Sequence, residues 1–181
     1  WRTGMFISQL IQKSYDAGNN YFVLNTQKVK GLHNLGHQIQ GTKKRKIKLK
    51  IEGDAGNGCG WYSKNSIITI GGNLGDWFGR DSNNSTITIR GDVGDYCGYD
   101  SNNLIITIGG NAGYECGRYS TDSTIIIGGN AGNWCGLNST DSTFKVRNEL
   151  LYEQLKTKLD FDKSNKLFLI RPDGTEEVYR P

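Results

Sequence analysis

Cysteine has the widest potential chemistry in this chain, because a thiolate can bind zinc, hold an iron–sulfur cluster or form a disulfide. Zinc and cluster sites use short local spacings such as C-x-x-C, whereas these cysteines recur at a 19-residue period. Stacked β positions lie about 4.8 Å apart, which is wider than the Cβ separation of about 3.8 Å that a disulfide prefers. We therefore predict a buried ladder of reduced thiols, no cofactor and a cytoplasmic protein. The core ladder, with phenylalanine in one copy, is Cys59, Phe78, Cys97, Cys116 and Cys135.

Histidines and carboxylates are the other candidate metal ligands or catalytic groups. His33 and His37 are four residues apart, but no cysteine or carboxylate cluster completes the four ligands that zinc usually takes. A glycosidase would need paired carboxylates, yet the acidic positions alternate with Asn and Ser, which is typical of turns. We expect no metal site and no enzymatic activity, although the chain could be a non-catalytic part of an enzyme complex. The carboxylates in question are Asp76, Asp81, Asp95, Asp100 and Asp122.

Glycine clusters suggest phosphate binding, because glycine-rich loops can cradle phosphates. The motif G-x-x-G-x-x-x-G occurs in five copies spaced 19 residues apart, and no Lys-Ser or Lys-Thr follows it as in a Walker loop. Copies in phase instead indicate a repeated backbone geometry, since glycine adopts φ > 0 or a close approach without steric cost. The structural glycines are Gly53, Gly56, Gly60, Gly72, Gly75, Gly79, Gly91, Gly94, Gly98, Gly110, Gly113, Gly117, Gly129, Gly132 and Gly136.

A basic stretch precedes the repeats. Residues 1–52 carry ten basic and two acidic side chains, a net charge of +8 within a chain whose net charge is +4. Such a patch could bind nucleic acid or another anionic surface in a salt-sensitive way. It could also be an outward lysine row that protects the first rung from edge pairing; we favour this interpretation, because no aromatic residues interleave with the lysines. The patch is Lys43, Lys44, Arg45, Lys46, Lys48 and Lys50.

The elements that position these groups follow from the two arms of each repeat. The glycine arm carries G-x-x-G-x-x-x-G, and the second arm reads S-x-I-x-I. Its alternation places two apolar columns on one face. Since one repeat cannot close a core, stacked repeats would bury a continuous interior, and the terminal rungs would need caps. By the same register, residues 46–51 form the first rung. The repeats therefore predict an all-β, single-stranded parallel β-helix of about six 19-residue rungs. The two columns are Ile68, Ile87, Ile106, Ile125 and Phe144, and Ile70, Ile89, Ile108, Ile127 and Val146.

Both ends of the chain depart from the repeat, as caps should. Residues 5–16 predict a short helix whose apolar face contains Phe6, Ile7, Leu10 and Ile11, and residues 21–24 predict a strand. Residues 34–41 resemble a degraded copy of the repeat. Residues 148–159 predict a second helix, with Leu159 on its apolar face, followed by a hairpin. We divide the chain into an N-terminal cap (1–33), β-helix repeats (34–147) and a C-terminal cap (148–181).

Two outward surfaces are candidates for binding. The outward positions of the second arm form a flat Thr/Ile face, which favours partner docking over ice binding, because Lys145 interrupts it. Outward aromatic side chains near the glycine arm could hold a protein partner or sugar rings. This possible partner or ligand face consists of Trp61, Trp77, Tyr96, Tyr99 and Trp134.

The pattern T-I-x-I-x-G-N-A-G-x-x-x-G over residues 34–147 resembles a known glycine-repeat β-helix family. That β-helix is shared by the C-terminal domain of the glutamate synthase large subunit and by one of the subunits of formylmethanofuran dehydrogenase. The motif is clearest from Ile125 through Gly129, Asn130 and Gly136. The resemblance implies a right-handed β-helix without catalytic residues, which positions partner subunits. We thus expect a scaffold or interaction module that binds other protein subunits or itself, with no membrane partner. The alternatives are a carbohydrate-binding or carbohydrate-acting solenoid, and a nucleic-acid or anionic-surface binder.

Overall fold

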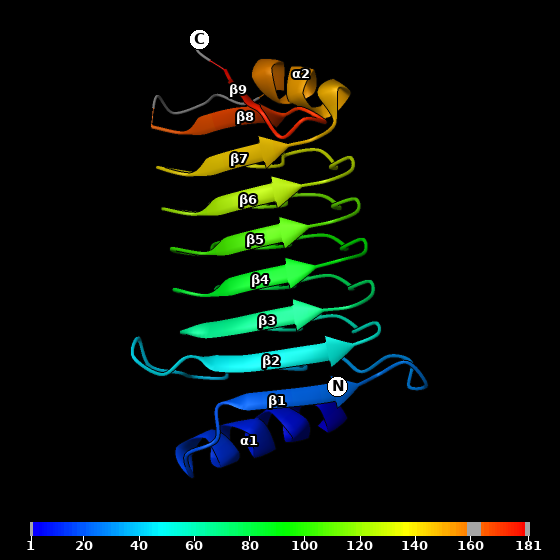
Figure 1. Cartoon of the computed structure of the whole chain (residues 1–181), viewed down its shortest axis with the longest axis vertical. Helices are drawn as coiled ribbons and strands as arrows, with labels where there is room; N and C mark the ends of the chain where they lie inside the picture. The colour runs from blue at the N-terminus through cyan, green and yellow to red at the C-terminus, as the bar shows by residue number, and fades with distance from the viewer. Residues whose placement is uncertain (1, 159–163, 180–181) are drawn as a thin grey trace.

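The protein is a right-handed β-solenoid of about six turns, as predicted. The computed structural model describes residues 2–158 and 164–179. In Figure 1 the strands run from left to right across the front, and the chain returns behind them one level higher. One sheet contains all the described strands in sequence order, and only the last pairing is antiparallel. The helices are α1 (Arg2–Asp16) and α2 (Glu149–Lys158); the strands are β1 (Tyr21–Asn25), β2 (Ile47–Glu52), β3 (Ser66–Ile70), β4 (Thr86–Ile89), β5 (Ile105–Ile108), β6 (Thr124–Ile127), β7 (Thr143–Val146), β8 (Lys166–Ile170) and β9 (Glu176–Val178).

The inner face of this sheet forms one wall of the core. From β3 to β7 each residue pairs with the residue 19 positions later, so identical columns stack along the axis. Ile68, Ile87 and Ile106 are fully buried, while the alternate residues Thr69 and Thr88 lie outward and remain partly or largely exposed. The β-branched side chains fit this pleated, half-buried arrangement.

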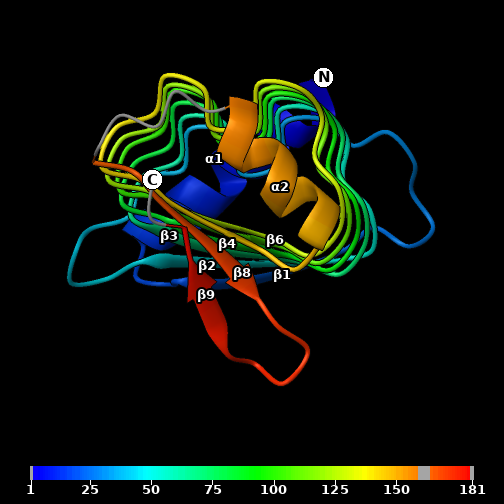
Figure 2. The same cartoon turned by 90° about the horizontal axis from the view of Figure 1, so that it is seen from above.

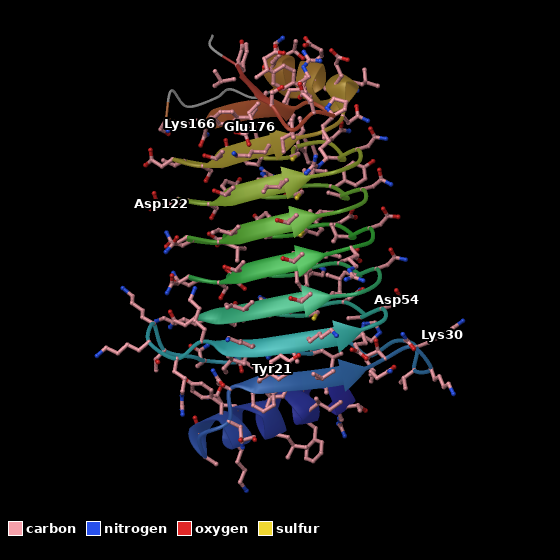
Figure 3. The ribbon with its side chains drawn as sticks, viewed as in Figure 1. Tyr21, Lys30, Asp54, Asp122, Lys166 and Glu176 are labelled. Atoms are coloured by element: carbon pink, nitrogen blue, oxygen red, sulfur yellow. The ribbon has the colours of Figure 1, made fainter. Side chains whose placement is uncertain are left out.

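The first glycine of each repeat is required because the preceding coil approaches it closely. A Cβ at Gly72 would overlap the Oδ1 atom of Asp54, and a Cβ at Gly91 would overlap that of Asn73. Asp54 Oδ1 accepts the backbone N–H of Asn73 at 2.7 Å, and Asn73 Oδ1 accepts that of Asp92 at 2.8 Å. These side chains link successive coils along the turn edge where Figure 3 labels Asp54.

Four positions in each coil adopt a left-handed backbone. In one coil they are Trp77 (φ 62°), Gly79 (φ 61°), Asp81 (φ 52°) and Asn84 (φ 50°), and the other coils repeat the pattern. Asparagine, aspartate and glycine tolerate this conformation best. The backbone geometry therefore accounts for the aspartates and asparagines at these turns.

The N-terminal segment contributes a complete coil. β1 pairs in parallel with β2, and Gly60 N–H donates to the Leu35 carbonyl at 2.8 Å. Residues 46–51 therefore belong to the second strand, and the expectation that they form the first rung was wrong. Tyr21 pairs with Lys48, 27 residues later, because loops around residues 27–31 and 42–46 enlarge this coil.

Helix α1 covers the open end of that coil with a face that agrees with the predicted one at Ile11 and differs from it at Phe6 and Leu10. It buries Gly4, Ser8, Ile11 and Tyr15, whereas Phe6 is 59% exposed. Small residues lie inward because the helix approaches the chain closely: a Cβ at Gly4 would overlap a backbone carbonyl, and Ser8 Oγ donates to the Asn34 carbonyl at 2.9 Å.

At the other end, α2 lies across the last coil (Figure 2). Leu151 and Leu155, on the inner face of α2, are buried in the core. β8 extends the parallel sheet, and β9 returns antiparallel to it as the predicted hairpin. Leu159, which was predicted on the same helix face, lies outside the described residues.

Candidate functional site

Aromatic side chains project from one left-handed position of the glycine arm. Trp77, Tyr96 and Trp134 share this position with Glu115 and Gly58. The rings of Trp77 and Tyr96 stack with centroids 3.9 Å apart and planes 3° apart. Trp134 is 57% exposed. The column therefore consists of a stacked pair at its centre and an exposed ring toward the C-terminal end.

Arginines lie against these rings and against those of the neighbouring column, and sequence reasoning missed them. The Arg80 guanidinium carbon lies 4.7 Å from the ring centre of Trp77, 5.4 Å from Trp61 and 5.3 Å from Tyr99. At such distances each pair makes a cation–π contact. The sequence contains the pattern that would have identified them. Residues 61, 80, 99 and 118 occupy one position of the repeat, and this position is alternately an aromatic residue and an arginine.

The second arginine repeats the arrangement two coils later. Arg118 lies 4.6 Å from the ring centre of Tyr119 and 5.7 Å from that of Trp134. It also pairs with Glu115 at 2.9 Å. Tyr119 was not predicted either, and it contacts Tyr99 edge-on with centroids 5.4 Å apart. We call this surface the arginine–aromatic ladder: Trp61, Trp77, Arg80, Tyr96, Tyr99, Arg118, Tyr119 and Trp134.

Carboxylates fix the arginine and tryptophan side chains of the ladder. Asp81 Oδ2 lies 3.1 Å from Arg80 Nε and accepts the Trp61 indole N–H at 3.1 Å. Burial, together with the charge of nearby Asp81, raises the pKa of Asp100. The ladder is thus held in shape before any partner binds, which limits the entropy that binding would cost.

A cavity of about 250 Å³ lies at the C-terminal end of the ladder, between the last coil and α2. Trp134 and Leu137 line it from the coil, and Leu151, Gln154 and Leu155 line it from the helix. The cavity is mainly apolar and borders the exposed ring of Trp134. It can therefore accommodate an apolar side chain of a molecule that docks on the ladder.

The side chains that were considered as metal ligands or catalytic groups make structural contacts. The four cysteines are buried with free thiols, and burial raises the pKa of Cys59 to about 12. His33 Nδ1 accepts the Asn57 N–H at 2.9 Å, and His37 packs edge-on against Trp61. Asp76 Oδ1 accepts a backbone N–H of the next coil at 3.0 Å. Within residues 2–158 and 164–179, no three His, Cys, Asp or Glu side chains gather as a metal site would require.

The basic patch divides between structural and exposed groups. Arg45 lies 4.1 Å from the Tyr15 ring centre and donates to the Tyr15 carbonyl at 2.9 Å, which attaches α1 to the first coil. Lys50 pairs with Glu52 at 2.7 Å. Lys48 and Lys50 lie on β2, one strand inside the sheet edge, so the predicted protection of the edge by this lysine row was wrong.

Neither described helix combines the length and the apolar character that crossing a membrane requires. Comparisons with protein-family models, with curated proteins and with solved structures found no match for this chain.

Proposed function

We propose that the protein is a non-catalytic scaffold or interaction module that binds a partner protein through the arginine–aromatic ladder. The observation that carries this proposal is the alternation of arginine with tryptophan and tyrosine in one repeat position. These three residue types dominate the energy of protein interfaces when they cluster. The adjoining apolar cavity supplies a pocket for an anchor residue, which is the usual companion of such a cluster.

The same role is what the resemblance to the β-helices of glutamate synthase and formylmethanofuran dehydrogenase implies. The partner would be another protein of a complex or a second copy of the chain. Further support comes from the acidic side chains, because those such as Asp54 and Asp76 bind backbone groups of neighbouring coils. Their role in holding neighbouring coils together supports a non-catalytic function.

The carbohydrate alternative is less well supported by the same surface. Sugar rings stack on the open faces of aromatic side chains. Trp77 and Tyr96 stack on each other, and Arg80 lies over the Trp77 ring. Trp134, with 57% of its surface exposed, is the ladder ring with the most open face, and one ring makes a poor platform for a glycan.

Site-specific photocrosslinking in the host cell tests the proposal. A photoreactive phenylalanine at Tyr119, which is 38% exposed, should crosslink a defined partner that mass spectrometry identifies. The Trp134→Ala exchange should abolish this product. A matched probe at Thr88, on the outer sheet face, is the control. Crosslinking at Thr88 but not at Tyr119 would contradict the assignment, as would glycan-array binding that depends on Trp134.

A further inference from the structure

The sheet has an unpaired edge at its N-terminal end. Lys48 N–H donates to the Asn20 carbonyl at 2.7 Å, and Thr26 N–H donates to the Glu52 carbonyl at 2.9 Å. In a parallel ladder alternate residues direct both backbone groups to the same neighbour. The N–H and C=O groups of Tyr21, Val23 and Asn25 therefore point away from β2, toward a side on which no described strand follows.

Apart from α1, which covers the open end of the coil, this edge lacks the devices that normally prevent strand pairing. Edge strands are usually protected by charge, by proline or by a covering element. At the opposite end β9 covers β8, and its own residues include Glu176 and Glu177. β1 reads YFVLN, without charge or proline, and Tyr21 and Val23 are 60% and 47% exposed. Figure 3 shows Tyr21 at the front of this unguarded end.

An apolar strip lies beside the edge. Ile7 of α1 and Phe22 and Leu24 of β1 are partly buried and pack against the core at this end of the solenoid. Leu10 is 50% exposed. The inward side chains of β1, Phe22 and Leu24, are only half-buried. A strand added to β1 would cover these groups with its own inward side chains.

The charge around the edge selects an acidic occupant. Residues 1–52 carry a net charge of +8. Lys48 and Lys50 stand directly beside Tyr21 and Val23 on the outer face of the sheet, and Lys50 also forms an ion pair with Glu52 at 2.7 Å. Outward side chains of an added strand would lie two strand spacings, about 9.6 Å, from these lysines. This separation is about one Debye length, and long side chains can close part of it. A second copy would bring the same basic end against itself, which is unfavourable.

We propose that the edge of β1 is a strand-addition site for an extended segment of a partner protein, with apolar side chains at its inward positions and acidic side chains at its outward positions. The backbone groups of the edge supply affinity, and the alternate side chains supply specificity. This site is separate from the arginine–aromatic ladder and does not depend on the function proposed for it.

Fluorescence anisotropy with a labelled peptide in which valine and glutamate alternate tests the proposal. The Val23→Pro exchange removes an outward N–H without removing a bond to β2, and it should weaken binding about tenfold, since a hydrogen bond and close approach are lost. Lys48→Glu with Lys50→Glu should weaken binding, whereas the matched Lys43→Glu with Lys44→Glu should change it much less. Trp134→Ala should leave peptide binding unchanged, which separates this test from that of the ladder.

Two further measurements test backbone pairing between the peptide and β1 directly. N-methylation of the peptide amides that face β1 should abolish binding to the unmodified protein, whatever the stability of the Val23→Pro variant. Amide exchange at Tyr21, Val23 and Asn25 should slow when the peptide binds. Equal binding of the methylated peptide would overturn the proposal. So would a concentration-dependent dimer that Val23→Pro abolishes, because the occupant would then be a second copy.

Discussion

Replacing Gly98 with alanine tests whether the glycine column serves backbone conformation, interior space or both. Gly98 has φ 65°, and an added Cβ would lie 2.7 Å from Cδ1 of the fully buried Ile106. A left-handed alanine costs about 1–2 kcal/mol, and overpacking a core costs about 1–3 kcal/mol. The Gly98→Ala exchange should therefore lower the free energy of unfolding by about 2–5 kcal/mol. Urea denaturation followed by circular dichroism measures this loss.

Two matched variants separate the contributions. Gly174 has φ 85° with nothing near an added Cβ, so Gly174→Ala should cost only the conformational part, about 1–2 kcal/mol. Ile106→Val removes the methyl group that the new Cβ would meet and alone costs about 0.5–1.5 kcal/mol. The double variant Gly98→Ala with Ile106→Val should lose clearly less than the sum of its two single losses. Strict additivity, or equal losses at Gly98 and Gly174, would refute the steric argument.

The remaining predictions concern titration. Burial raises the pKa of Cys59 to about 12, and the hydrogen bond to Cys116, followed by burial, raises that of Cys135, so thiol reagents at pH 8 should label these cysteines only after urea is added. Rapid labelling of the native protein would contradict their place in the core. Burial lowers the pKa of His37 below its ordinary value of 6.5. Its neutral form is favoured by folding, so stability should fall as the pH falls through 6.5 toward the lower folded pKa. The His37→Gln variant should lose this part of the pH dependence in urea titrations, and an unchanged profile would show that His37 does not cause it.

The stacked coils were predictable because their determinants are local and repeated. An alternating Ile-x-Ile segment and a glycine at a fixed interval each constrain the backbone in the same way in every copy, so the register could be read before the structure. The first coil could not be read in this way. Its loops change the offset between paired residues to 27 at Tyr21, and the pairing of β1 depends on tertiary contacts.

The aromatic residues of the candidate site could be predicted from the sequence, whereas its arginines could not. Trp61 and Tyr99 stood out as bulky outward residues, but Arg80 between them was hidden, because an exposed arginine is ordinary on any surface. Its role depends on where the turn directs the guanidinium, 4.7 Å from the Trp77 ring centre. The face of α1 was misjudged for a related reason: close approach to the first coil places Gly4 and Ser8 inward, and the larger Phe6 outward.

From β2 to β7 the interval between paired residues is constant, so the length of the molecule depends on the number of repeats. Each coil adds one strand spacing, about 4.8 Å, along the axis. The edge of β1 and the cavity beneath α2 lie at opposite ends of this axis (Figure 1). Gain or loss of one 19-residue unit would therefore change the separation of whatever binds at the two ends by one step. It would leave both end surfaces intact, so reach could evolve independently of recognition.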